Sequence, residues 1–206
     1  MNNCVDVISQ EVCHQGFLNL VRYRVRHSLF RGGWSRLLER ERLEGLRAAV
    51  VLLYDPYLDR VVLVEQFRIG LMEQGRGAWT LEPIGGLVTP DSDAVATVRQ
   101  EAKEEAGCEI SVLESIGTVY VSPGFSDDCI ALFCGRVHSD GLGGIHGLEE
   151  EGEDIRVVVI DAAQAFDELF CGRINSTAAI ISIQWLAANR GRLRTIWASK
   201  SRPGQG

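Results

Sequence analysis

The chain has 206 residues, which is enough for one full hydrophobic core and leaves little for a second domain. Hydrophobic residues make up 46% and charged residues 24% of the chain, the balance of an ordinary soluble globular protein. The formal net charge of -7 argues against nucleic acid as the main partner, because a phosphate backbone requires a basic surface. An acidic protein can still take an anionic substrate when bound metal ions supply the positive charge.

The sequence also bears on where the protein works. The segment from Met1 to Gln15 lacks the basic start and apolar core of a signal peptide. No apolar run reaches the ~18 residues that a membrane-spanning helix needs. The sequence therefore predicts a cytoplasmic protein without a membrane partner.

The first element in chain order is a strand. The segment Phe17–Val25 alternates in polarity, so its apolar and aromatic side chains share one face and its arginines share the other. The arginines are Arg22, Arg24 and Arg26. A basic strand face in an acidic protein is better placed at an interface or ligand cleft than on a free surface. We therefore expect a homodimer built partly from residues ~10–50.

Strands dominate the middle of the chain. Two apolar runs, Leu46–Tyr54 and Arg60–Phe67, flank a turn at Asp55-Pro56 and predict a hairpin. Further strands are predicted at Ile116–Val121, Cys129–Val137 and Ile155–Ile160. Helical patterns occur at Asp93–Ala106, at Ala162–Phe170 with Asp161 as its expected N-cap, and at Asn175–Asn189. Because helices are inserted singly among strands, the order predicts an α+β fold with a mixed sheet, not a doubly wound one.

The segment Asp93–Ala106 is the most informative helix. Turn and N-cap residues precede it at Thr89–Ser92, and Gly107 follows it in the position of a left-handed C-cap. An apolar stripe is expected to face the core, and three glutamates share an adjoining arc of about 100°. The stripe is Val95, Val98, Ala102 and Ala106, and the glutamates are Glu101, Glu104 and Glu105.

Three glutamates this close repel one another, and a solvated helix face is one way to bear that charge. A hard divalent cation offers another, since Mg²⁺ binds carboxylate and phosphate oxygens together. The neighbouring Gly85-Gly86 pair suits the second interpretation, because glycines let the backbone approach an ion closely.

The segment Gly86–Cys108 resembles the Nudix box, G-x5-E-x7-R-E-U-x-E-E-x-G-U, where U is an aliphatic residue. Gly86, Glu101, Glu104, Glu105 and Gly107 match the motif in register. The resemblance implies a Nudix-type α/β/α sandwich with a mixed sheet, preceded by an N-terminal antiparallel sheet. It also implies a Mg²⁺-dependent pyrophosphohydrolase.

Two positions depart from the box, where Ser92 replaces its first glutamate and Gln100 replaces its arginine. Asp91, Asp93 and Arg99 are neighbours, but their helical phase differs. An arginine can fix the orientation of a carboxylate, whereas glutamine offers a neutral amide. The departures therefore predict a reduced rate. A weakened protein that senses ADP-ribose without cleaving it is the alternative.

Stretches outside the box resemble the bacterial ADP-ribose pyrophosphatases over about Phe17–Asn189. They are Tyr23–His27, Glu65–Gly70, Trp79–Gly86, Ser122–Asp128, Gly144–Val157 and Ile174–Leu186. This resemblance implies hydrolysis of ADP-ribose to AMP and ribose 5-phosphate. A Nudix hydrolase for another nucleotide sugar, such as GDP-mannose, stays open as an alternative.

The resemblance implies a catalytic centre with two or three Mg²⁺ ions, for which Mn²⁺ can substitute. The implied metal ligands are the Gly85 carbonyl, Glu101, Glu104, Glu105 and Glu153. Glu151 maps to the base that activates water, and Glu101 and Glu105 to catalytic carboxylates. The residues alone do not choose among the acids of the loop Glu149–Asp154, and a solvated acidic loop is the alternative.

For the substrate, the resemblance implies that Arg68 binds phosphate and that Glu82, Gly86 and Asp128 contact the nucleotide sugar. Members of the family are homodimers that exchange the N-terminal sheet, so that Phe17 and Arg40 of the partner subunit sandwich the adenine. The alternatives are a surface role for Arg68, structural hydrogen bonds for the two acids, and a core position for Phe17. The expected domains are residues 1–50 for dimerisation, 51–195 for catalysis and 196–206 as a flexible tail.

Overall fold

The computed structural model describes residues 3–73, 75 and 77–198. The chain forms two compact units, one made of Met1–Arg47 and Tyr120–Cys129, the other of Ala48–Val119 and Ile130–Gly206. The predicted N-terminal region, residues 1–50, overlaps the first unit, which also takes in residues 120–129.

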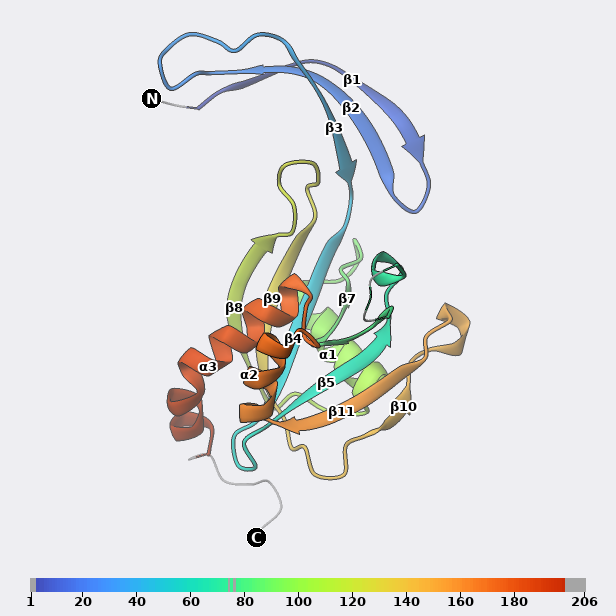
Figure 1. The fold of residues 1–206 in the computed structure, drawn as a ribbon, viewed down its shortest axis with the longest axis vertical. Coiled ribbons are helices and arrows are strands. Elements are labelled where there is room, and N and C mark those ends of the chain that lie inside the picture. Colours follow the sequence, from blue (N-terminus) through green and yellow to red (C-terminus); the bar gives the residue numbers. More distant parts are fainter. Residues whose placement is uncertain (1–2, 74, 76, 199–206) are drawn as a thin grey trace. The chain divides into compact units, whose positions relative to one another are not determined.

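The first unit contains a three-stranded antiparallel sheet in the order β1-β2-β3 (Figure 1). Its strands are β1 (Val5–Gln15), β2 (Asn19–His27) and β3 (Leu38–Glu44). The register places Arg22 of β2 opposite Glu11 and Glu41, and its guanidinium lies 3.5 Å and 3.2 Å from these carboxylates. Arg26 pairs with Asp6 at 2.8 Å in the same way. Arg22 and Arg26 are thus paired within their own sheet, and the expected interface stays a prediction.

The second unit is built on an eight-stranded sheet. The path β10-β11-β5-β4-β9-β8 forms it, with β6 paired to β5 and β7 paired to β4. The strands are β4 (Arg47–Asp55), β5 (Arg60–Phe67), β6 (Trp79–Glu82), β7 (Ile84–Leu87), β8 (Val112–Tyr120), β9 (Cys129–Arg136), β10 (Gly144–His146) and β11 (Ile155–Asp161). The predicted β4–β5 hairpin is present as an antiparallel pair. Strands β4 and β9 run parallel, since Cys129 N bonds to Leu46 O and Val137 N to Tyr54 O, so the sheet is mixed as predicted.

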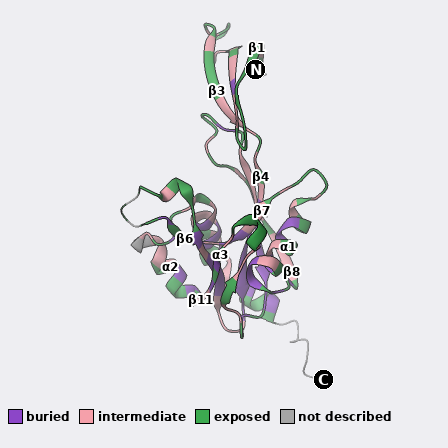
Figure 2. Ribbon diagram, turned by 90° about the vertical axis from the view of Figure 1, so that its right-hand side faces the viewer, coloured by how far each residue is buried: buried purple, intermediate pink, exposed green. Residues whose placement is uncertain are grey.

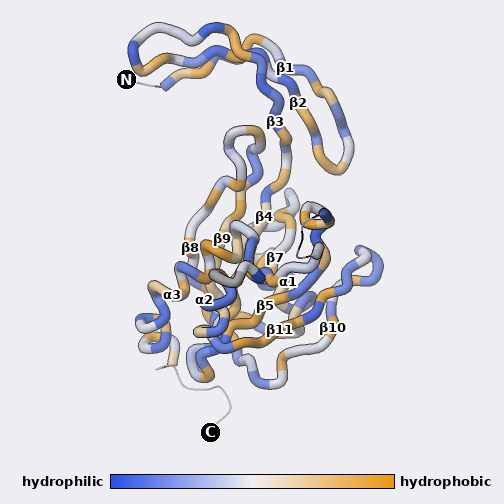
Figure 3. The backbone as a smooth tube through the Cα atoms, viewed as in Figure 1, coloured by the Kyte–Doolittle hydropathy of each residue, from blue (hydrophilic) through white to orange (hydrophobic). Residues whose placement is uncertain are grey.

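Helices cover both faces of this sheet, as Figure 1 shows. They are α1 (Ala94–Ala106), α2 (Ala162–Cys171) and α3 (Thr177–Ala198), with short 3-10 turns η1 (Ile69–Leu71) and η2 (Glu149–Glu151). In β5, Val62 and Val64 pack in the core beneath α1, while Val61 and Leu63 pack in the core beneath α2 and α3. Burial on both faces explains why β5 reads as a continuous apolar run. Figures 2 and 3 show the buried and hydrophobic residues along these strands.

Some helix details differ from the predictions. Val95 is exposed, whereas Val98, Ala102 and Ala106 of the same stripe are buried, and in the first turn Ala94 packs against the core in place of Val95. Asp161 precedes α2 but makes no side-chain cap, and its carboxylate accepts from Arg60 instead. Helix α3 continues to Ala198, so the predicted tail 196–206 begins as helix, and residues 199–206 lie outside the described residues.

Asp59, in the turn of the β4–β5 hairpin, links the hairpin to α3 through hydrogen bonds. This residue has a φ of 58°, which is uncommon for a side chain other than glycine and is tolerated best by Asp and Asn. Its carboxylate accepts hydrogen bonds from the Tyr54 hydroxyl at 2.7 Å and from Arg190 and Arg194 of α3. Within the described part of the chain, no helix is both long and apolar enough to cross a membrane.

Candidate active site

The carboxylates of α1 are presented by a helix with well-formed ends. Asp93 is the N-cap and accepts from Ala96 N at 2.8 Å, so the cap lies one residue beyond the predicted turn Thr89–Ser92. At the other end Gly107 has a φ of 60°, the left-handed C-cap that the sequence predicted. The buried stripe then fixes how the helix is rotated, and Glu101, Glu104 and Glu105 follow on the adjoining arc.

Strand β7 runs directly against these carboxylates. Gly85 N donates to Glu105 Oε2 at 3.2 Å. A Cβ on Gly86 would lie 1.8 Å from Glu101 Oε1, a distance no real side chain tolerates. Gly85 is equally constrained on its other side, because a Cβ there would lie 2.5 Å from Ala49 O of β4. The two glycines therefore leave a cradle that any larger residue would fill.

Burial and like charge perturb two of these acids. Glu105 is only 2% exposed, and burial raises its pKa to about 8, with the Glu101 carboxylate adding to the rise. Burial also raises the pKa of Glu101 to about 7, and Glu104, Glu153 and Glu151 add to it. Buried carboxyl groups that repel each other need a counter-charge to ionise together.

The acidic loop lies close enough to take part. The negative charges of Glu151 and Glu153 both raise the pKa of the Glu101 carboxyl, and that of Glu153 also raises the pKa of Glu105. Both loop acids belong to the turn that joins β10 to β11. The loop acids thus lie within electrostatic reach of carboxylates on α1, although they come about fifty residues later in the chain.

One arginine faces this acidic group. Arg68 follows β5, and its Nε donates to Glu82 Oε2 of β6 at 2.7 Å. The positive charge of Arg68 lowers the pKa of the Glu105 carboxyl, but burial raises that pKa by more. Its side chain is about half exposed, so the guanidinium can reach an anion from outside.

Three predicted substrate residues belong to the first unit. Phe17 is 82% exposed, which makes the alternative of a core position wrong. Arg40 lines a cavity of about 230 Å³ that lies wholly within that unit. Asp128 ends the loop 122–128, and its amide donates to Ser126 Oγ at 3.0 Å. The cavity is lined by Val5, Val7, Tyr23, Val25, Arg40, Glu41, Arg42, Pro123, Gly124, Phe125 and Ser126.

Across the described residues, no three His, Cys, Asp or Glu side chains are grouped as a ready-made metal site. Neighbouring carboxylates raise the pKa of Glu101 and of Glu105. Their convergence on a cation stays a prediction for the metal-bound protein.

Comparison with known proteins decides the family. The model of the NUDIX domain matches residues 45–173, which include β7, α1 and the acidic loop. The chain belongs to the Nudix family. The predicted resemblance and the predicted sandwich fold are thereby confirmed.

Its relatives include the ADP-ribose pyrophosphatase of Escherichia coli strain K12, with 37% identity covering 95% of this chain and 94% of that protein. The ADP-ribose pyrophosphatase of Haemophilus influenzae is 38% identical over 94% of this chain and 90% of its own length. The GDP-mannose pyrophosphatase of Escherichia coli O1:K1 is 30% identical over 72% of this chain and 77% of its length. The crystal structure of an ADP compounds hydrolase shares the fold, with a TM-score of 0.66, 18% identity, and coverage of 90% of this chain and 95% of that one.

The two departures from the Nudix box occupy different places. Gln100 Nε2 donates to Glu104 Oε1, so the amide holds one of the box glutamates. Ser92 Oγ lies 3.2 Å from Thr97 Oγ1 and serves the start of α1. Arg99 does not replace the missing arginine, because its guanidinium donates to Ile110 O at 2.7 Å.

Sequence reasoning gave the Gly85 carbonyl a role in this Nudix site but missed the backbone amides that hold its carboxylates. Leu148 N donates to Glu153 Oε2 at 3.0 Å, which positions that carboxylate. A backbone amide carries no residue-type signature, and the only available signal was the glycine that precedes it. Gly147 lies in the stretch Gly144–Val157 that resembles the family, and the sequence alone assigns it no role.

Proposed function

We propose that this protein hydrolyses the pyrophosphate bond of ADP-ribose, with water, to AMP and ribose 5-phosphate. The observation that carries the proposal is the buried Glu105, set among other carboxylates against the Gly85–Gly86 backbone with Arg68 nearby. The two ADP-ribose pyrophosphatases that match nearly the whole chain support this choice of substrate.

The residues present fit a divalent cation. Hard oxygen donors are what Mg²⁺ prefers, and the absence of a side chain on Gly86 lets the Glu101 carboxyl lie against the β7 backbone. The group that would hold the ions is the Gly85 carbonyl with Glu101, Glu104, Glu105 and Glu153. We propose Mg²⁺ as the natural ion, in two or three copies, with Mn²⁺ as a substitute. Bound there, it would neutralise the pyrophosphate and stabilise the charge that develops on it.

The protein's own groups account for the remaining steps. Arg68 binds a phosphate oxygen, and Glu82 holds the guanidinium in place through the 2.7 Å hydrogen bond. Glu151 takes a proton from the water that attacks one phosphorus in line. Glu101 and Glu105 remain fixed against β7, so the substrate is oriented by groups that do not move during the reaction.

We propose that base recognition requires a homodimer. In it, Phe17 and Arg40 of the partner subunit would hold the adenine, and Asp128 would contact the ribose. Phe17 is exposed and the Arg40 cavity is large enough for a ring, which supports such contacts. Residues 1–47 carry eight arginines and five acidic side chains, whereas the rest of the chain carries 13 basic and 23 acidic ones. That charge asymmetry favours association between copies.

The second candidate substrate is GDP-mannose, because the GDP-mannose pyrophosphatase of Escherichia coli O1:K1 also matches this chain. It ranks below ADP-ribose because that match is weaker and covers less of the chain. A substrate panel separates the two.

The test is hydrolysis of ADP-ribose, GDP-mannose and other nucleotide sugars with Mg²⁺, read as phosphate released after phosphatase treatment. Glu105→Gln is expected to lower kcat for ADP-ribose at least a hundredfold, about 2.7 kcal/mol of barrier, while the protein stays folded. Glu109→Gln is the matched control, because Glu109 follows the same helix, is exposed, and only pairs with Lys103 at 3.5 Å. Binding of ADP-ribose without turnover would support a sensor and overturn the proposal.

A further inference from the structure

The acidic loop is folded around the backbone of one residue. Leu148 N donates to Glu153 Oε2 at 3.0 Å. Leu148 O accepts from Glu151 N at 3.0 Å and from Glu153 N at 3.2 Å. Gly152 N closes the turn on Glu149 O at 3.0 Å. The two acids assigned to chemistry, Glu151 and Glu153, are thus held by the same peptide groups.

The residue before Leu148 must be glycine for this arrangement to exist. Gly147 has a φ of 100°, where other residues are strained. A Cβ on Gly147 would also lie 2.7 Å from Glu153 Cβ and 3.3 Å from the Glu153 carbonyl carbon and oxygen. Real Cβ atoms do not approach each other so closely, so any side chain at 147 would push Glu153 away.

Both ends of the loop are anchored. His146 of β10 pairs with Ile155 of β11, and Ile155 is fully buried. The His146 ring packs at the end of α1, where a Cβ on Gly107 would meet its Cε1 at 3.2 Å. The loop is therefore tied to the same helix that carries Glu101 and Glu105. A displacement of Glu153 would be local, because the strands on either side stay in register.

We propose that Gly147 and Leu148 form a positioning element that presents the Glu153 carboxylate to the divalent cation through one oxygen. This inference rests on the proposed function. The Leu148 amide takes one lone pair of Oε2 and fixes the carboxylate plane, and we assign Oε1, which this amide does not bind, to the cation. Groups that hydrogen-bond to a metal ligand set its orientation and basicity, and their loss commonly costs about tenfold in metal affinity.

The experiment compares Gly147→Ala with Gly144→Ala. Gly144 lies in β10 with a φ of 92°, so alanine there is strained to a similar degree. Its Cβ would meet only the His146 Nε2 at 3.8 Å, an ordinary contact. The readouts are Mn²⁺ binding by calorimetry without substrate, the melting temperature in EDTA, and kcat for ADP-ribose.

Gly147→Ala is expected to weaken Mn²⁺ binding about tenfold, while Gly144→Ala leaves it within about twofold and melts at a similar temperature. Introduced into Glu153→Gln, Gly147→Ala is expected to weaken binding no further, because the residue acts through Glu153. Unchanged Mn²⁺ binding in Gly147→Ala, equal losses in both alanine variants, or additive losses in the double variant would each overturn the inference. Wild-type protein that binds no Mn²⁺ and cleaves nothing would instead refute the proposed function.

Discussion

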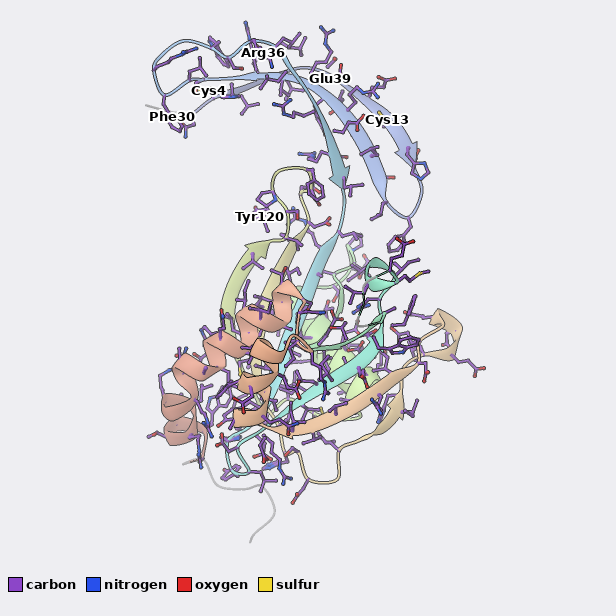
Figure 4. The ribbon with its side chains drawn as sticks, in the orientation of Figure 1. Cys4, Cys13, Phe30, Arg36, Glu39 and Tyr120 are labelled. Carbon is purple, nitrogen blue, oxygen red and sulfur yellow. The ribbon has the colours of Figure 1, made fainter. Side chains whose placement is uncertain are left out.

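The two units of this chain hold their sheets together by different means. In the second unit both faces of the sheet are covered, and strands such as β4 and β5 bury most of their side chains. Among the described residues of the first unit, Val21 is the only apolar side chain that is buried. Val12 of β1 is 60% exposed and Phe30 is 92% exposed. The side chains of Cys13, Phe30, Arg36 and Glu39 project outward (Figure 4).

This difference in apolar burial implies that the two units have different sources of stability. Burial of apolar area contributes roughly 25 cal/mol per Å², so the second unit has its own source of stability. The first unit relies on strand pairing and on exposed ion pairs such as Arg22–Glu41, which are worth little individually. A sheet with so much exposed apolar surface is expected to gain stability from a second surface that covers it.

The largest expected effect is the loss of the proposed dimer contact on the exposed apolar side of the first unit's sheet. Val12→Asp places a charge on the exposed apolar part of β1, and burying an unpaired charge in an interface is costly. We expect its dimer dissociation constant to rise at least a hundredfold, about 2.7 kcal/mol. Light scattering after size-exclusion chromatography measures this.

The matched control is Val95→Asp, at an exposed position on α1 of the second unit, which is expected to leave the dimer intact. A wild-type protein that is monomeric at micromolar concentration would remove the proposed dimer altogether.

A smaller effect is expected when the stability contributed by an ion pair of the second unit is compared with that of an ion pair of the first. The Arg190 guanidinium beside Asp59 holds the pKa of that carboxyl below its usual range, and the Tyr54 hydroxyl assists. A lowered folded-state pKa stabilises the protein above the unfolded pKa of about 3.9, and this contribution is lost as pH falls through the folded value. Asp59→Asn is therefore expected to lower the free energy of unfolding by about 1.5 kcal/mol at neutral pH, with the difference shrinking below about pH 4.

Urea denaturation at several pH values measures this, with Asp6→Asn as the control from the first unit. The Asp6–Arg26 pair is exposed, so its loss is expected to cost less than about 0.5 kcal/mol. Equal effects of the two substitutions would mean that exposure does not separate the ion pairs of the two units.

The smallest expected effect concerns the departures from the Nudix box. Gln100 holds Glu104 with a neutral amide, whereas an arginine would add charge and a second hydrogen bond. We expect Gln100→Arg to raise kcat for ADP-ribose several-fold, about 1 kcal/mol of barrier, and Ser92→Glu to add less. Steady-state kinetics on the wild type, the single variant and the double variant measures this. Equal rates in all three would show that both substitutions are neutral.

The bounds of an element are predicted most accurately from the sequence where the element is packed against the core. Strand β5 was predicted at Arg60–Phe67 and lies there, and α1 differs from its prediction by one residue. Strands β1 and β3 were missed for the opposite reason. Strand β3 reads LERERLE, a charged segment without an apolar alternation, and β1 has register shifts after Val7 and Val12 that disrupt its period.

Those missed strands also hid the partners of two of the arginines. Arg22 looked unbalanced in the sequence because its partners, Glu11 and Glu41, lie on β1 and β3. The candidate site was more accessible to prediction, since its glutamates share one helix and one motif. What remained hidden was the part made by backbone groups, the Gly85 and Leu148 amides, whose positions follow from strand pairing and loop closure.

The sheet of the second unit separates its core into two halves, and this separation affects which substitutions the protein can accept. Leu63 of β5 and Ile183 of α3 pack in the core between the sheet and helices α2 and α3, on the face opposite the helix that carries Glu101. Substitutions that repack that side can raise or lower thermostability without touching the box, whereas a change at Ala102 moves the helix that carries the glutamates. Natural selection and directed evolution can therefore adapt this protein to temperature on one side of the sheet while its chemistry is retained on the other.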